Sequence, residues 1–139
     1  MRALSLVALT TLLVACGGDR DSASESHDEH NASFDPSSIT PAELALGDSL
    51  FHGLIGAVSC QACHGADAKG GPAAANLTDS VWLHSDGSFE AIYKQIETGV
   101  ATPKVAVGMM PPFGGAPMTP AQHRAVAAYV YSLSHKVGK

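Results

Sequence analysis

Residues 59–72 read SCQACHGADAKGGP, and the chemistry of this stretch decides how the rest of the sequence is interpreted. It contains Cys60 and Cys63, with His64 directly after the second cysteine. Cysteine pairs at this spacing carry out thiol redox reactions, hold a structural zinc ion or attach a haem covalently. The residues around the pair distinguish among these three possibilities.

Three stretches have the periodicity and the end signals of helices, and no run alternates strictly as a strand would. They are TPAELALGDSLFHGL (residues 40–54), SFEAIYKQIETG (88–99) and TPAQHRAVAAYVYSLSH (119–135). A Thr-Pro cap opens the first and the third, and Gly99 stops the second. The residues expected on the buried faces are Gly47, Leu50, Phe51 and Leu54; Phe89, Ile92, Tyr93 and Ile96; and Val126, Tyr129, Val130 and Leu133. The sequence therefore predicts an all-α domain with three main helices and long loops.

The setting of the cysteine pair favours haem over the other two possibilities. A thioredoxin-like redox pair needs a βαβ unit, which the predicted helices do not supply. A structural zinc site needs four ligands, yet the third cysteine of the chain is Cys16, far toward the N-terminus, and no H-x₃₋₅-H motif follows the pair. C-x-x-C-H is the signature of covalent c-type haem attachment. Long loops and the thin core of three short helices also favour a large apolar cofactor.

The order of the three residues gives each of them a role. On one helical turn the sulfurs of Cys60 and Cys63 face the same side, so we expect both to reach the vinyl groups at one edge of a single haem. His64 follows directly and is the expected proximal ligand of the iron.

The ligand on the other side of the iron decides what such a haem does. The candidates are Met109, Met110, Met118, His52, His84, His123 and His135. We favour Met110 because Pro111 and Pro112 follow it: a residue before proline is held extended, and a double proline stiffens the loop. Met109 lacks that restriction and is expected to pack on the haem or the core. In the alternative interpretation both methionines are apolar filler.

The N-terminal part of the chain reads as an export signal followed by a tether. Residues 1–15 carry one positive charge, at Arg2, and a short apolar run, which is typical of a secretory signal peptide. The sequence LVAC at residues 13–16 resembles the lipobox of bacterial lipoproteins, so Cys16 is the expected lipidation site; an ordinary cleavage site with an incidental cysteine is the alternative. Residues 16–38, rich in Ser, Asp and Glu, are expected to form a flexible acidic tether, and residues 39–139 the haem domain.

The predicted domain resembles class I cytochrome c. The resemblance rests on a helix with Gly47 and Phe51, the CQACH motif, a Met-Pro loop and a last helix with Tyr129. The stretches NLTDSVWLHSDGSFEAIYKQIETGV, MPPFGG and VAAYVYSLSH are similar in finer detail to the haem domains in the dihaem cytochrome c subunit of C-family haem–copper oxidases. This likeness covers residues 42–135.

The resemblance implies thioether bonds at Cys60 and Cys63, with His64 as the proximal and Met110 as the distal ligand. The family usually has a proline directly before the NL of this stretch, in the region whose carbonyl orients the proximal histidine. This chain has Ala75 there, so the identity of that carbonyl is open at this point. Only one haem motif is present, whereas the oxidase subunit has two.

With histidine and methionine both on the iron, no coordination position is left for oxygen or a substrate, which suits electron transfer. The sequence therefore predicts a monohaem electron carrier rather than an enzyme, tethered to a bacterial membrane and facing the periplasm, or the outer surface in a Gram-positive host. Its expected partners are a redox donor and a redox acceptor. One alternative is a fixed cytochrome c subunit of an oxidase or dehydrogenase; another is a haem protein that reacts with a small ligand or peroxide. The absence of a basic patch with interleaved aromatics excludes nucleic acid as a partner.

Overall fold

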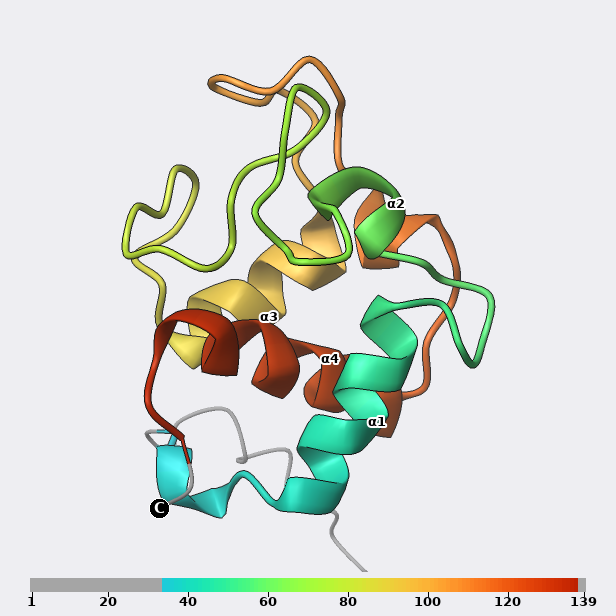
Figure 1. The fold of residues 1–139 in the computed structure, drawn as a ribbon, viewed down its shortest axis with the longest axis vertical. Helices are drawn as coiled ribbons and strands as arrows, with labels where there is room; N and C mark the ends of the chain where they lie inside the picture. The colour runs from blue at the N-terminus through green and yellow to red at the C-terminus, as the bar shows by residue number, and fades with distance from the viewer. Residues whose placement is uncertain (1–33, 138–139) are drawn as a thin grey trace, which may run out of the picture. The chain divides into compact units, whose positions relative to one another are not determined.

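The computed structural model describes residues 34–137, and within them every regular element is helical (Figure 1). The predicted signal peptide, Cys16 and most of the tether lie outside the described residues. In chain order the elements are η2 (Pro36–Ser38), α1 (Pro41–Phe51), α2 (Gln61–His64), α3 (Phe89–Thr98), η3 (Pro112–Gly115) and α4 (Pro120–Ser134). The all-α fold class is confirmed. None of the helices in residues 34–137 is long and apolar enough to cross a membrane.

The three main helices begin where a hydroxyl side chain caps the first turn. Thr40 accepts the backbone N–H of Glu43 at 3.1 Å, and Ser88 accepts that of Ala91 at 3.2 Å. Thr119 forms a reciprocal capping box with Gln122. Because these signals are local, the sequence placed the starts of α1, α3 and α4 within a residue of where they lie.

The first and last main helices cross at a glycine. A Cβ atom on Gly47 would overlap the carbonyl oxygen of Ala125 and approach the Cβ of Tyr129 to 2.7 Å, so the two backbones are in contact there. An ion pair between Arg124 Nε and Glu43 Oε1, 2.8 Å long, joins the same two helices. The α4 segment packs against both α1 and α3, and its buried residues are therefore spread over more than one face: His123, Ala125, Val126, Ala127, Ala128 and Val130.

The first predicted helix is longer than the observed one, and Leu54 was wrongly placed on its buried face. α1 ends at Phe51, with His52 as its C-cap and Gly53 in the left-handed region at φ +68°. This glycine turns the chain away from the helix axis. The side chain of Leu54 is 73% exposed as a result.

Packing begins before the predicted boundary at residue 39. Phe34 stacks on Phe89 with ring centroids 3.7 Å apart, and its backbone N–H donates to Glu90 Oε1 at 2.8 Å. The guanidinium of Arg124 lies 5.6 Å from the centroid of the Phe34 ring. The packed part of the chain thus extends back at least to Phe34, because this one aromatic side chain finds an apolar surface on α3.

Candidate functional site

The cysteine pair lies at the short helix α2, for which Cys60 is the N-cap. Cys60 and Cys63 are not bonded to each other. Burial raises the pKa of the Cys60 thiol to about 11, so this sulfur is not the stabilised thiolate that a thiol-redox site requires. Within residues 34–137 no three His, Cys, Asp or Glu side chains gather as a metal-binding cluster. Both observations agree with two thiols available for covalent attachment of a cofactor.

The ring of His64 is held by a backbone carbonyl. Its Nδ1 lies 2.9 Å from the carbonyl oxygen of Ala75; since a carbonyl only accepts, Nδ1 carries the proton and donates. Burial lowers the pKa of His64, and the bond to Ala75 opposes that effect only in part. The ring is therefore neutral, with the lone pair on Nε2 available to a metal. Ala75 itself supplies the carbonyl whose identity the sequence did not settle.

A tight loop brings Ala75 back to His64. The N–H of Gly70 donates to the His64 carbonyl at 2.8 Å, and Gly71 donates to the Ala74 carbonyl at 2.9 Å. Gly70 has φ +70°, and a Cβ there would lie 2.5 Å from the carbonyl oxygen of Ala74 and from the carbonyl carbon of Ala75. The close approach of these two backbone segments therefore requires glycine. The glycine pair in "AKGGP" was the sequence signal for this turn.

Met110 is fixed by backbone pairing with the end of α3. Its N–H donates to the Val100 carbonyl at 3.0 Å, and the Val100 N–H donates to the Met110 carbonyl at 2.8 Å. Gly99, at φ +69°, leaves room for this bridge, because a Cβ there would overlap the Met110 carbonyl oxygen. The side chain of Met110 packs on the core, whereas that of Met109 is 64% exposed. The sequence argument from the two prolines missed this non-local bridge.

Cys60, His64 and Met110 line two adjoining cavities, and Cys63 lines the first of them. Both cavities share Cys60, His64, Gln95, Met110 and Gly114 in their lining; the first also includes Cys63, His84 and Lys104. The rest of the second cavity's lining is largely apolar and comes from α1, α3, α4 and the loops: Phe51, Leu77, Trp82, Ile92, Ile96, Phe113, Met118, Val126 and Val130. The chain thus brings the four predicted cofactor-binding residues, Cys60, Cys63, His64 and Met110, to the wall of one cavity.

These residues fit a haem. The cavity is apolar, as a porphyrin requires, and it offers two thiols together with the nitrogen and sulfur donors that bind haem iron. In addition, Oε1 of Gln95 is buried on the cavity wall without a hydrogen-bond partner among the described residues. A buried polar atom in this state is usually satisfied by a group that is not part of the polypeptide, such as a cofactor or an ordered water molecule.

The other candidate ligands lie in different surroundings. Met118 is partly buried, packs on the core and lines the second of the two cavities only. His123 is buried: its ring stacks on Tyr93 with centroids 3.6 Å apart, and its Nε2 donates to the Tyr93 carbonyl at 2.9 Å. His135 stacks on Tyr131 at the end of α4. Of the four histidines other than His64 considered as ligands, only His84 lines the cavity.

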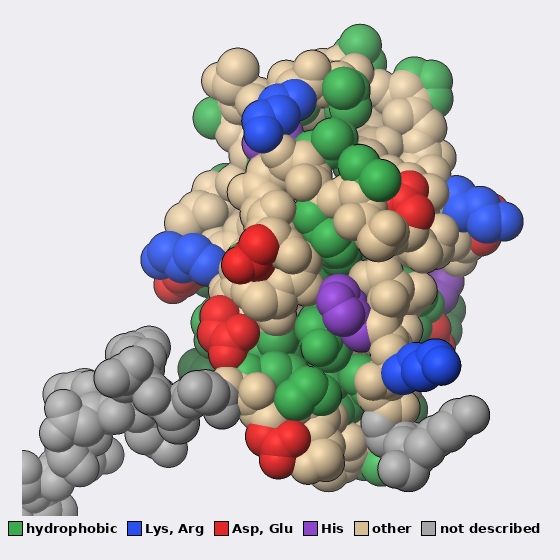
Figure 2. Space-filling view, turned by 90° about the vertical axis from the view of Figure 1, so that its left-hand side faces the viewer, with side chains coloured by type: hydrophobic (Ala, Val, Ile, Leu, Met, Phe, Trp, Pro, Cys, Tyr) green, Lys and Arg blue, Asp and Glu red, His purple; other side chains and the backbone are tan. Residues whose placement is uncertain are grey.

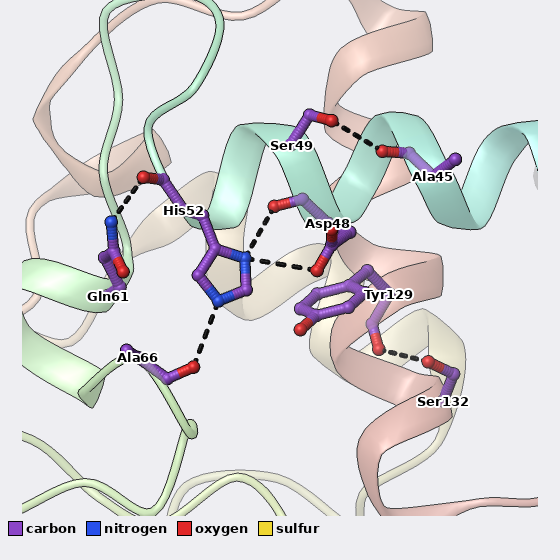
Figure 3. Close-up of polar contacts among 8 residues, drawn as sticks. All are labelled: Ala45, Asp48, Ser49, His52, Gln61, Ala66, Tyr129 and Ser132. Carbon is purple, nitrogen blue, oxygen red and sulfur yellow. Dashed lines mark hydrogen bonds and ion pairs between the residues drawn. The ribbon is translucent and has the colours of Figure 1, made fainter.

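His52 joins α1 to the loop that follows the cysteine pair (Figure 3). Its Nδ1 lies 2.9 Å from the Asp48 carbonyl oxygen and 3.1 Å from Asp48 Oδ1, and its Nε2 lies 3.0 Å from the Ala66 carbonyl oxygen. The side chain of Gln61, inside the CQACH motif, donates to the His52 carbonyl. Because both ring nitrogens face only acceptors, the imidazolium form satisfies this arrangement best. The backbone bonds to Ala66 and Asp48 accordingly raise the pKa of His52.

This arrangement predicts a pH-dependent stability. A raised folded-state pKa stabilises the fold fully below the unfolded value of about 6.5, and the contribution disappears as the pH rises through the folded-state pKa. Replacing His52 by Gln is therefore expected to lower the free energy of unfolding by about 0.5 kcal/mol more at pH 5.5 than at pH 9, on the scale of solvent-screened pairs. Urea unfolding at the two pH values measures the difference. An equal effect at both would show that His52 does not titrate through these contacts.

The fold and the cavity together define a small all-helical domain built to attach a haem through a C-x-x-C-H motif. A family model for cytochrome c matches residues 44–134, and the chain belongs to the cytochrome c family. Membership in this family implies covalently bound haem c. It confirms the family that the sequence resembled.

Similar proteins include subunits of cbb3-type cytochrome c oxidases. The chain is 43% identical over 94 residues to the cbb3-type cytochrome c oxidase subunit CcoP of Rubrivivax gelatinosus, covering 68% of this chain and 27% of that protein. It is 45% identical over 94 residues to the cbb3-type subunit FixP of Sinorhizobium medicae, covering 66% of this chain and 30% of that one. The chain therefore spans about a third or less of the length of these relatives.

A solved structure supports the fold. Cytochrome cL of the marine methylotroph Methylophaga aminisulfidivorans superimposes with a TM-score of 0.57 at 19% identity, over 88% of this chain and 74% of that chain. At this level of identity the likeness concerns the fold alone. It confirms the small helical cytochrome c architecture that the sequence predicted.

Proposed function

We propose that this protein passes single electrons to or from a cbb3-type terminal oxidase through one haem. The haem is attached at Cys60 and Cys63 and bound axially by His64 and Met110. The observation that carries the proposal is that all four side chains line the same cavity. The identity of about 40% to subunits of cbb3-type oxidases supports the choice of partner.

The residues of the chain suit this role. The bound haem supplies an iron that changes its charge by one electron. His64, oriented by Ala75, offers a neutral nitrogen, and Met110, held by its bridge to Val100, offers a sulfur. Two ligands fixed by backbone contacts move little when the charge of the iron changes, which favours fast electron transfer over the binding of a substrate. Cys63 is exposed, so a haem attached there would have one edge near the surface.

Two modes of association with the oxidase are compatible with this role. In the first, the chain docks as a fixed cytochrome c subunit, as the names of its relatives suggest. In the second, which follows from LVAC and the acidic tether, the chain is a free-standing carrier anchored through Cys16 to a bacterial membrane. We favour the first mode, the fixed subunit, because the similar proteins are themselves named as oxidase subunits.

The test uses the full chain, matured with covalent haem in a host that contains a cbb3-type oxidase. We expect a low-spin spectrum in both redox states, no reaction with carbon monoxide, a reversible one-electron titration and oxidation by the purified oxidase in air. Co-purification with the oxidase would identify a subunit, and separate purification with efficient oxidation a carrier. A high-spin haem that binds carbon monoxide readily would contradict electron transfer and indicate ligand or peroxide chemistry.

A further inference from the structure

We propose that Lys104 and His84 form the binding site for the propionate carboxylates of the haem. The inference rests on the proposed function, because it requires a haem in the cavity. A haem brings two carboxylates with it, and each needs a cation or several hydrogen-bond donors where the site is apolar.

The cavity wall offers few groups that suit a carboxylate. Lys104 is the only lysine or arginine among the described residues that line either cavity, and no aspartate or glutamate lines them. His64 faces the iron in the proposed function, and the unpartnered Oε1 of Gln95 is an acceptor, which repels a carboxylate. The Ser59 hydroxyl, the Trp82 indole N–H and the Gln95 amide N–H are neutral donors on the two linings. Among the described residues there, Lys104 is the one cationic side chain, and His84 lies beside it.

Lys104 and His84 are held together by the backbone. The N–H of Lys104 donates to Nε2 of His84 at 3.2 Å, and the Lys104 ammonium donates to the carbonyl of Leu83. Since Nε2 of the neutral ring accepts, Nδ1 carries the proton and is a donor. The ammonium keeps two further N–H donors beyond the one given to Leu83. The pair can therefore donate several hydrogen bonds to a carboxylate.

The loop that carries Lys104 is fixed on its other side as well. The Val107 N–H donates to the Pro72 carbonyl at 3.0 Å, and a Cβ on Gly108 would lie 2.7 Å from the Ala73 carbonyl oxygen. The loop between α3 and η3 thus contacts both the 72–75 segment and the 83–84 segment, and all three line the first cavity. Figure 2 shows a basic side chain directly beside a histidine at the top of the face it displays, among exposed hydrophobic side chains. The position of the ammonium is therefore set by the fold.

The placement also agrees with the shape of a haem. Its vinyl groups, which bind the cysteines, and its propionates lie at different edges of the ring. Figure 1 shows α2, next to the cysteines, on the opposite side of the upper half of the domain from the loop that precedes α3, where His84 lies. A haem attached at Cys60 and Cys63 that extends across the cavity would therefore direct its far edge toward His84 and Lys104.

The test compares Lys104→Gln with Lys69→Gln in the full haem-loaded chain. Lys69 is also an exposed loop lysine, ion-paired with Asp67, but it does not line either cavity. Loss of a cation beside a propionate favours the ferric state. We expect the ratio of oxidised to reduced protein at a fixed potential to rise about twofold to tenfold in Lys104→Gln, as for unit charges about 10 Å apart. A tenfold rise lowers the midpoint by 59 mV. In Lys69→Gln the ratio should stay nearly unchanged.

A second readout observes the carboxylates directly. Redox difference infrared spectra of protein whose haem carries ¹³C in the propionate carboxyls should show these bands shifted in Lys104→Gln and in His84→Phe, but not in Lys69→Gln. Unshifted propionate bands in Lys104→Gln, or equal potentials in the two lysine variants, would overturn the site. If either result is found while the wild-type haem is low-spin and its one-electron titration is reversible, the proposed function stands and only this inference fails. A chain that takes up no covalent haem would overturn both.

Discussion

Replacing Met110 by leucine is expected to convert the haem-loaded protein from a low-spin form that does not bind carbon monoxide to a form that binds it. Leucine has nearly the volume of methionine, so the packing of this side chain on the core is largely kept while the sulfur donor is lost. The midpoint potential should also fall by about 0.1 V or more, within the roughly 0.8 V range that axial ligands control. Optical spectra in both redox states, with and without carbon monoxide, measure the first effect, and a spectroelectrochemical titration measures the second.

Met109→Leu is the matched control for this prediction. Met109 is the adjacent residue, has the same side chain and lines the same cavity, but it is 64% exposed and has no backbone bridge like that of Met110. We expect its spectrum and potential to remain close to those of the wild type. Loss of the methionine–iron absorption band in Met109→Leu, with Met110→Leu unaffected, would assign the distal ligand to Met109 instead. If neither variant changed the spectrum, neither methionine would be a ligand.

Much of the fold could be predicted because its signals are local. Thr40 and Thr119 cap their helices through side chains three residues from their partners, and Gly99 ends α3 where the chain must adopt a positive φ. Cys60, Cys63 and His64 form a contiguous motif, so the attachment site also needed no long-range information. In each case the residues that specify the structure lie within one helical turn of one another.

What the sequence did not reveal depends on contacts between distant segments. The bridge from Met110 to Val100 closes a loop of nine intervening residues, and no pattern in GMMPPFGG indicates it. The stacking of Phe34 on Phe89 joins residues that are far apart in the chain, so composition alone assigned Phe34 to the tether. Leu54 fitted the helical period, yet the left-handed Gly53 decided where the helix ends. Periodicity identifies candidate positions, and tertiary contacts then select among them.

The helix crossing at Gly47 supports the wall of the haem cavity. Phe51 on α1 and Val126 on α4 both line the second cavity; Phe51 lies one helical turn after Gly47, and Val126 directly follows Ala125, which Gly47 contacts. The separation of the two helices therefore determines how closely the cavity wall packs behind the cofactor. A side chain at Gly47 cannot be accommodated by a rotamer change, because the obstacle on α4 is backbone.

Gly47→Ala is consequently expected to destabilise the haem-loaded protein by at least about 2 kcal/mol, since overpacking of this kind usually outweighs the gain of about 1 kcal/mol in helix propensity. Urea unfolding followed by the haem absorption and by far-ultraviolet circular dichroism measures the change. Gly71→Ala is the matched control, because no atom lies within 4 Å of a Cβ at Gly71. Its stability should change by no more than about 1 kcal/mol. Equal stabilities of the two variants would show that α1 and α4 can separate without cost. The crossing would then not be what holds the cavity wall against the haem.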